Sequence, residues 1–302
     1  MTSDLLAIDQ KASNSLLDAS KNGLIDTVEA LVGNGAIVDA SDENGSSSLI
    51  WAARNGHDEV VKLLLEHDAA VDLVNAKGGT ALMIAAWGGH LEVITQLLNA
   101  GAAIDRQHPN GNTALAFACA FGQLEAAQSF IEAGACVNGQ NQLGITPLML
   151  AVRNGHADVV KLLLETGASL DLRDKEGWTA LISASHSGHS NTVLLLLENG
   201  ADVNQQNVDG FSALTCACSN GHVSTARILL EYGADINVVE KDGDTSLLLA
   251  AKNDYVDVVE LLLKNGALVD VVNREGTTAL VHAALNDNAG IVKLLLEYGA
   301  IR

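Results

Sequence analysis

Residues 144–168 read GITPLMLAVRNGHADVVKLLLETGA, and the rest of the chain can be read as copies of this stretch. Its first glycine belongs to a series in which each glycine follows the previous one after 33 residues. The series consists of Gly45, Gly78, Gly111, Gly144, Gly177, Gly210, Gly243 and Gly276. A fixed period of this size indicates a stack of supersecondary units rather than one globular core.

Each copy predicts two helices joined by a turn. Thr146 has a hydroxyl that can cap a helix, and Pro147 suits the first helical position, where a missing N–H costs nothing. Asn154 and Gly155 predict the end of that helix, since both accept the left-handed conformation that ends helices. A second helix is expected over residues 158–165, which are too apolar for a lone surface helix, and an extended finger then leads to the next glycine.

This pattern resembles the ankyrin repeat. Thr-Pro-Leu at 146–148, followed by small residues, Gly-His, a leucine triplet and Gly-Ala, is similar to the signature of that family, and the match covers nearly the whole chain. The resemblance implies an all-α solenoid in which each repeat is a helix-turn-helix with a β-hairpin finger. We expect a leader at 1–11 and nine repeats over 12–302. A degenerate capping repeat occupies 12–44, with Asn14 at its capping position, and the others start at 45, 78, 111, 144, 177, 210, 243 and 276.

Composition and charge exclude several classes of ligand and location. The 302 residues carry a formal net charge of −20, which disfavours nucleic acid and membrane surfaces as partners, because both require Lys and Arg to neutralise phosphates. The start of the chain does not resemble a signal peptide, and no run of about 18 apolar residues predicts a membrane span. We expect a monomeric protein in the cytoplasm, with the nucleus as a further compartment.

The cysteines and histidines do not predict a catalytic or metal site. Cys119 and Cys218 occupy positions filled by alanine in other copies and are interpreted as small core residues. Cys216 and Cys218 form a Cys-x-Cys pair, but no second pair follows, and a helix would direct the two side chains apart. A histidine after the turn glycine recurs in five copies, whereas a catalytic group would be unique. We expect no catalytic residue, no metal and no cofactor.

The resemblance places protein partners on the concave face formed by the fingers and the first helix of each repeat. Large apolar side chains and arginines gather at variable positions of that face in the middle copies, and such residues favour interface hot spots. The candidate partner-binding residues are Trp87, Phe121, Leu143, Ile145, Arg153, Arg173, Trp178 and Phe211. The alternative is that one or two of them pack against neighbouring fingers. Trp51 and Phe117 are expected in the core.

A second resemblance concerns modification. Asn204 and Asn237 lie in sequences that look like those hydroxylated by asparaginyl hydroxylases in this family. The alternative is structural, because an asparagine or aspartate at this position shapes the finger turn in nearly every copy.

These observations together favour a non-enzymatic scaffold or adaptor that binds a protein partner. The alternative is a structural or self-assembling repeat module, or the repeat fragment of a larger protein.

Overall fold

The computed structural model describes residues 2–301, with side chains from residue 11 onward. These residues form eighteen helices and no strand. The chain divides into two compact units, Met1–Leu150 (unit 1) and Ala151–Arg302 (unit 2). The division falls inside helix α9 (Pro147–Arg153), and each unit is described by itself below.

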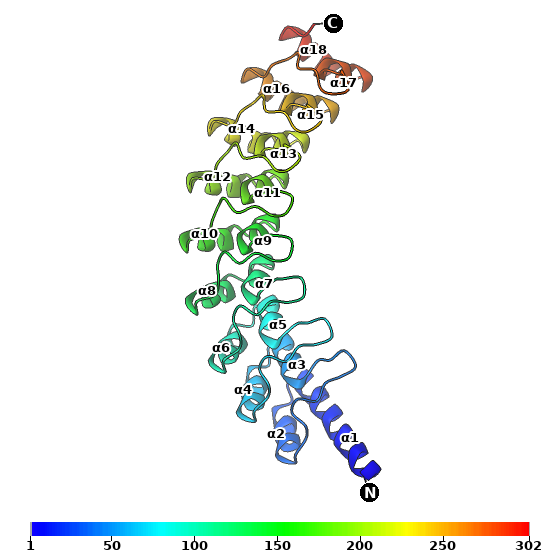
Figure 1. Cartoon of the computed structure of the whole chain (residues 1–302), viewed down its shortest axis with the longest axis vertical. Helices are drawn as coiled ribbons and strands as arrows, with labels where there is room; N and C mark the ends of the chain where they lie inside the picture. Colours follow the sequence, from blue (N-terminus) through cyan, green and yellow to red (C-terminus); the bar gives the residue numbers. More distant parts are fainter. Residues whose placement is uncertain (1, 302) are drawn as a thin grey trace. The chain divides into compact units, whose positions relative to one another are not determined.

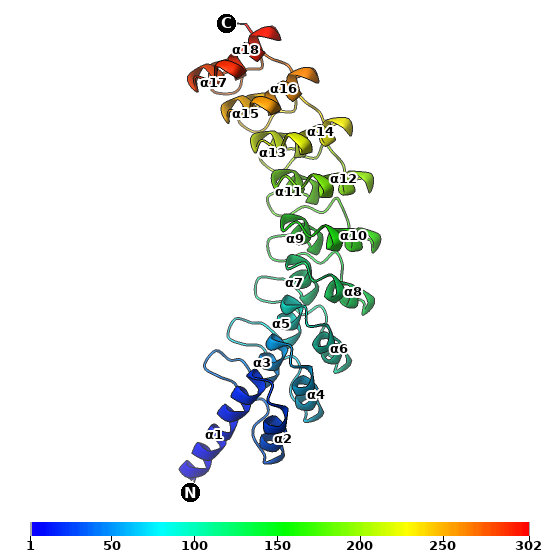
Figure 2. The same ribbon diagram turned by 180° about the vertical axis from the view of Figure 1, so that it is seen from behind.

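Unit 1 stacks its helices in two rows (Figure 1), which the view from behind shows equally (Figure 2). The first helices of its repeats pack on one another in the order α1, α3, α5 and α7, and the second helices in the order α2, α4, α6 and α8. The first helices are α1 (Thr2–Lys21), α3 (Ser48–Asn55), α5 (Ala81–Gly88) and α7 (Ala114–Ala120). The second helices are α2 (Ile25–Gly33), α4 (Asp58–Glu66), α6 (Leu91–Asn99) and α8 (Leu124–Glu132).

Unit 2 repeats the same arrangement. Its first helices are α11 (Ala180–His186), α13 (Ala213–Ser219), α15 (Ser246–Lys252) and α17 (Ala279–Leu285). Its second helices are α10 (Ala157–Glu165), α12 (Ser190–Glu198), α14 (Val223–Glu231), α16 (Val256–Lys264) and α18 (Ala289–Glu297). The predicted order of helix, turn, helix and finger is therefore confirmed for the repeats from residue 45 onward.

Hydroxyl side chains start the first helices, as the Thr146 position predicts. The Thr146 hydroxyl accepts a hydrogen bond from the Met149 amide at 3.2 Å, and Pro147 is the first helical residue. Seven other first helices begin in the same way, with a serine or threonine that accepts from the amide three residues later. These caps are Ser47, Thr80, Thr113, Thr179, Ser212, Thr245 and Thr278. Each cap satisfies an amide that the helix itself leaves without an acceptor.

The 33-residue glycine series follows from the way that neighbouring fingers approach each other. Gly45 has a φ of +69°, and a Cβ there would lie 2.9 Å from the Ala76 nitrogen of the next finger. That nitrogen donates to the Asn44 carbonyl at 2.9 Å, so adjacent fingers are joined by a backbone hydrogen bond. Four fingers also contain one isolated antiparallel bridge each. A side chain at Gly45 would strain the turn and separate the two fingers.

One column of second-helix residues forms the centre of each stack. Its members are fully buried and recur every 33 residues. They are Leu64, Leu97 and Phe130 in unit 1, and Leu163, Leu196, Leu229, Leu262 and Leu295 in unit 2. Because a second helix cannot cover this column alone, neighbouring repeats stabilise one another.

The first repeat differs from the sequence-based expectation. Helix α1 runs from Thr2 to Lys21 without interruption, so Asn14 lies inside the helix, and the prediction that Asn14 caps it is wrong. The same helix crosses the expected boundary between residues 11 and 12. At the opposite end, Asp254 and Asp287 have φ values of 62° and 55°, which confirms that they take the place of the turn glycine.

Candidate protein-binding face

Two kinds of element form the face on which partners are expected: the fingers and the first helices. In each unit the fingers extend from the first helices on the side away from the second helices (Figure 1). We call this surface the finger face. The eight candidate residues divide between the two units, four in each.

Trp87 and Phe121 form an exposed aromatic pair on the finger face of unit 1. Trp87 lies near the end of α5 and is 44% exposed, and Phe121 follows the last residue of α7 and is 50% exposed. Their ring centroids are 5.8 Å apart with the rings nearly perpendicular, which is a favourable edge-to-face geometry. The two rings therefore hold each other in place while both keep a large open surface.

Arg54 extends the aromatic pair with a positive charge. Its guanidinium carbon lies 6.0 Å from the Trp87 ring centroid and 5.3 Å from the Trp51 ring centroid. Both distances suit cation–π attraction. Beside these groups is a hollow of about 310 Å³ lined by Arg54, Asn75, Lys77, Gly79, Met83, Ile84, Trp87, His108 and Phe117.

The prediction that Trp51 and Phe117 lie in the core is wrong. Both are half-buried, and Phe117 lines the hollow just described. Phe117 packs edge-to-face on His108 with ring centroids 5.6 Å apart. The indole N–H of Trp51 donates to the Asp42 carboxylate at 3.0 Å, which explains why this end of the ring stays near water.

The finger that contains Leu143 and Ile145 contributes only one of these two candidates to the surface. Leu143 is 60% exposed at the finger turn, whereas Ile145 is only 8% exposed and lies in the core. Ile145 therefore offers almost no area to a partner, and we leave it out of the finger face. Its amide instead donates to the Asn141 side chain at 3.0 Å, a contact that shapes the turn.

In unit 2, Trp178 is the centre of a second group. Its ring lies edge-to-face on His186 with centroids 5.3 Å apart, and both residues line a hollow of about 320 Å³ together with Arg153, Glu176, Ser183 and Ser187. Arg153 donates to the Asp174 carboxylate at 2.8 Å. Because Asp174 also accepts from the Trp178 amide at 2.9 Å, one carboxylate fixes both the finger turn and the arginine.

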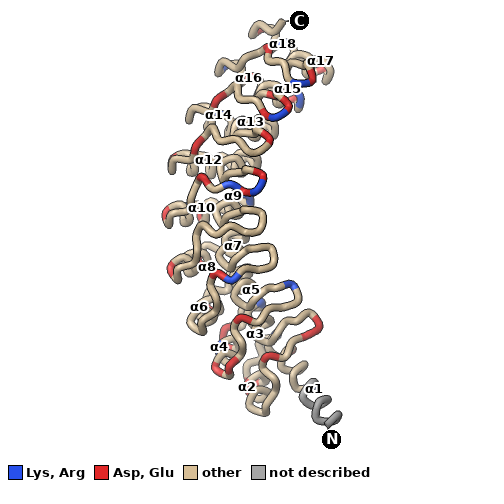
Figure 3. Tube along the Cα trace, in the orientation of Figure 1, with Lys and Arg blue, Asp and Glu red and all other residues tan. Residues whose placement is uncertain are grey.

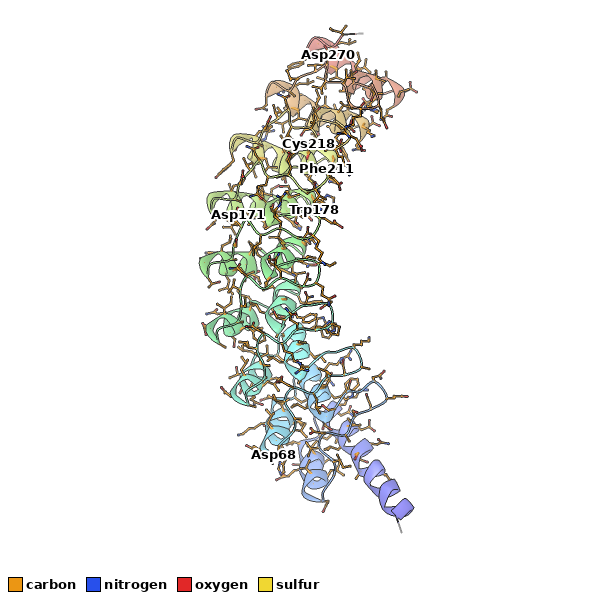
Figure 4. All side chains as sticks on the ribbon, in the orientation of Figure 1. Asp68, Asp171, Trp178, Phe211, Cys218 and Asp270 are labelled. Atoms are coloured by element: carbon orange, nitrogen blue, oxygen red, sulfur yellow. The ribbon has the colours of Figure 1, made fainter. Side chains whose placement is uncertain are left out.

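Phe211 and Arg173 are the other two candidates of unit 2. Phe211 is half-buried, and Figure 4 shows it with Trp178 on the finger side of unit 2, in successive repeats. Arg173 donates to the carbonyls of Gly177, at 3.2 Å, and Gln206. Its guanidinium thus joins two fingers, and we assign Arg173 a structural contribution in addition to the predicted one.

The recurring histidines connect neighbouring repeats. In three copies the histidine Nε2 lies about 3 Å from a backbone carbonyl at the end of the preceding first helix, and in a fourth copy glutamine makes the same contact. The pairs are His57 with Lys21, His90 with Arg54, Gln123 with Trp87, and His222 with His186. These side chains join each repeat to the preceding one by a hydrogen bond, which accounts for their recurrence at the same position.

Three of the four cysteines are buried. Desolvation raises the pKa of Cys119 and Cys216 to about 12, and it does the same for Cys218, where Cys216 adds a smaller effect. Cys136 alone is exposed. Across the described part of the chain, no three His, Cys, Asp or Glu residues are grouped so that they could hold a metal ion.

Asn204 and Asn237 each join one finger turn to the next repeat. The Asn204 side-chain oxygen accepts from the Asp235 amide at 2.8 Å, and that of Asn237 accepts from the Leu268 amide at 2.9 Å. Aspartates make the corresponding contact elsewhere, as Asp39 does with the Ala70 amide. The structural alternative thus accounts for both asparagines, and their hydroxylation stays a prediction.

Charge is distributed unevenly over the finger face. Figure 3 shows α5 and α7 of unit 1 without acidic residues, while the fingers of unit 2 carry acidic and basic residues side by side. No helix within residues 2–301 combines the length and the apolar character needed to cross a bilayer.

Comparisons with known proteins agree with this repeat structure. The family described as "Ankyrin repeats (3 copies)" matches residues 16–108, 89–174, 115–207, 168–240 and 232–301. A solved structure of the human ASB11 ankyrin repeat domain is similar with a TM-score of 0.68 and 29% identity, over 74% of this chain and 100% of that one. Comparison with curated proteins gave no match.

Proposed function

Because the chain belongs to the ankyrin-repeat family, we propose that it is a non-enzymatic scaffold or adaptor that binds a protein partner through the finger face. Ankyrin repeats are generally protein–protein interaction modules. Within this family the partner is selected by a few surface residues on a common scaffold, so the argument depends on the particular side chains of this chain.

The observation that carries the proposal is the exposed pair of Trp87 and Phe121 beside the hollow at Arg54. Tryptophan and arginine are the residues that most often dominate binding energy at interfaces. The pair is held on short helices that are capped and packed on both sides, so docking a partner would freeze little additional motion. Such a pre-ordered surface can bind with few anchors.

The non-enzymatic part of the proposal is supported by how the polar side chains are used. His57, His90 and His222 hydrogen-bond to carbonyls of the preceding repeat, so the Nε2 atom of each ring is engaged in a structural contact. The buried thiols have raised pKa values, which opposes the thiolate form that a nucleophile requires.

The test is affinity capture with two double variants. Trp87→Ala with Phe121→Ala removes the finger-face pair, and Tyr232→Ala with Tyr298→Ala removes two tyrosines of similar exposure at the ends of second helices. We expect the first variant to lose a partner that the wild type and the second variant both retain, with an unchanged circular dichroism spectrum. Identical partners for all three proteins would refute the assignment of the face.

Self-association is a second candidate function, favoured by apolar side chains in the last repeat. Leu285 and Ile301 are 72% and 77% exposed, and Val281 is also open to solvent. Sedimentation velocity at two protein concentrations separates the candidates. A monomer at both concentrations agrees with the scaffold proposal, whereas growth in size with concentration supports self-association through this repeat.

A further inference from the structure

Two fingers and two first helices of unit 1 lack acidic residues although the chain is strongly acidic. The chain contains 37 Asp and Glu residues, yet none of them lies in residues 73–91 or 106–124, which include two fingers and helices α5 and α7. Lys77 and Arg54 line the hollow at this place. The local charge is therefore opposite in sign to that of the chain as a whole.

Arg54 also differs from the basic residues at the same position in other repeats. Arg153 and Lys252 lie 99 and 198 residues after Arg54, at the same position of their repeats, and each has a carboxylate partner. Arg153 pairs with Asp174 at 2.8 Å, and Lys252 pairs with Asp244 at 3.6 Å.

The positions that would supply such a carboxylate to Arg54 are neutral. Asp174 lies 21 residues after Arg153, and the residue 21 positions after Arg54 is Asn75. Asp244 lies eight residues before Lys252, and the residue eight positions before Arg54 is Ser46. Within the described residues Arg54 has cation–π contacts with Trp51 and Trp87 and no ion pair. Asp42, which lines a neighbouring hollow, is occupied by the Trp51 indole and two finger amides.

One wall of the hollow beside Arg54 is formed by a small residue. Gly79 occupies the finger position that holds Ile145, Trp178 and Phe211 in other repeats, and it lines the hollow with Met83 and Ile84. The volume of the hollow, about 310 Å³, is at the small end of the range of about 300–1,000 Å³ for ligand pockets. One large side chain of a peptide fits this size better than a cofactor does.

From these observations we infer that the finger face of unit 1 binds a short acidic segment of a partner protein. One large apolar side chain of the segment enters the hollow between Gly79 and Trp87, and a neighbouring carboxylate pairs with Arg54, with Lys77 adding long-range attraction. The inference rests on the proposed function and specifies the chemistry of its partner. In unit 2 the corresponding arginine already has its carboxylate within the chain.

The experiment selects peptides from a random display library on the full chain. We expect enrichment of sequences in which Asp or Glu flanks a Trp, Phe or Leu. Enrichment of Lys- and Arg-rich sequences, of sequences without charge preference, or of none would each overturn the inference. Binding of a selected, fluorescein-labelled peptide is then measured by anisotropy at low and high salt, and we expect weaker binding at high salt.

Two substitutions test the geometry with the same peptide. Asn75→Asp supplies within the chain the carboxylate that Arg54 lacks, and exposed ion pairs of this kind change affinity up to about fivefold. Gly79→Trp places a large ring at the wall of the hollow and narrows the space for the apolar side chain of the segment, and loss of a buried anchor weakens binding by about 30-fold. Asn207→Asp is the matched control, because Asn207 shapes its finger turn through the same two amide contacts in unit 2.

The expected result is weaker binding for Asn75→Asp and Gly79→Trp and unchanged binding for Asn207→Asp, with all three variants melting as cooperatively as the wild type. Equal binding by Asn75→Asp and the wild type would overturn the pairing with Arg54. Failure of this inference is distinguishable from failure of the proposed function. If the Trp87 and Phe121 variant loses its partner while the library yields no acidic peptides, only the acidic chemistry is wrong.

Discussion

Phe130 and Phe121 allow the packing of the stack to be tested with one chemical change at two levels of burial. Both belong to the repeat that starts at residue 111, but Phe130 is fully buried on α8 and Phe121 is half exposed. Removing a fully buried phenylalanine side chain costs about 3–5 kcal/mol, because the transfer free energy is lost and a cavity remains. Phe121→Ala removes one edge-to-face contact, worth about 0.5–1.5 kcal/mol, and exposes little new surface.

The expected difference between the two variants is therefore about 3 kcal/mol in the free energy of unfolding. Urea denaturation followed by circular dichroism measures it, and the free energies are compared through a fit that treats repeats as coupled neighbours. Phe130→Leu is the control, since leucine fills this position in the other repeats, and we expect it to retain most of the stability. Equal destabilisation by Phe130→Ala and Phe121→Ala would refute the assignment of core and surface.

Four further outcomes follow from the structure. Thr113→Ala should destabilise by about 1 kcal/mol in thermal melting, because the Ala116 amide loses its cap, and Thr113→Ser should restore it. Gly56→Ala should lower the free energy of unfolding more than Gly101→Ala does. Both glycines have a positive φ, which costs an alanine about 1–2 kcal/mol. At Gly56 the new Cβ would also lie 2.6 Å from the His90 ring, whereas at Gly101 it would meet no atom within 4 Å. Iodoacetamide at neutral pH should label only Cys136 in the folded protein and all four cysteines in urea, and labelling of a second thiol in the folded state would contradict the burial. Burial raises the pKa of the other three thiols, Cys119, Cys216 and Cys218, from 9.0 to about 12. As the pH rises, these thiols therefore ionise in the unfolded chain before they ionise in the folded one, which favours unfolding. The melting temperature should fall between pH 9 and 12.

The repeat architecture was predictable because it depends on local rules that recur. Thr146 caps the helix that follows it, and Gly45 gives its own turn a positive φ while lying against the next finger. The 33-residue period repeats each rule eight times. The first repeat was predicted less well. Asn14 suits a capping position by residue type, but helix α1 continues through it because the preceding residues also form helix.

The candidate face was predictable in part, because exposure depends on neighbours that the period does not reveal. Ile145 looked like a surface residue in register with Trp178 and Phe211, yet it is buried. Trp51 and Phe117 looked like core residues, yet they border hollows. A signal for the exposure of Trp51 and Phe117 was present, since the same position holds His282, a residue type that is less often fully buried than leucine or isoleucine.

Site-specific photo-crosslinking tests the central claim, that the finger face of unit 1 is where a protein partner binds. A benzophenone amino acid placed at Phe121 lies beside Trp87, and the same group at Tyr232 lies at the end of α14 with similar exposure. The account predicts that a partner protein crosslinks from position 121 and that position 232 yields none. Crosslinking from position 232 alone, or equally from both, would contradict it.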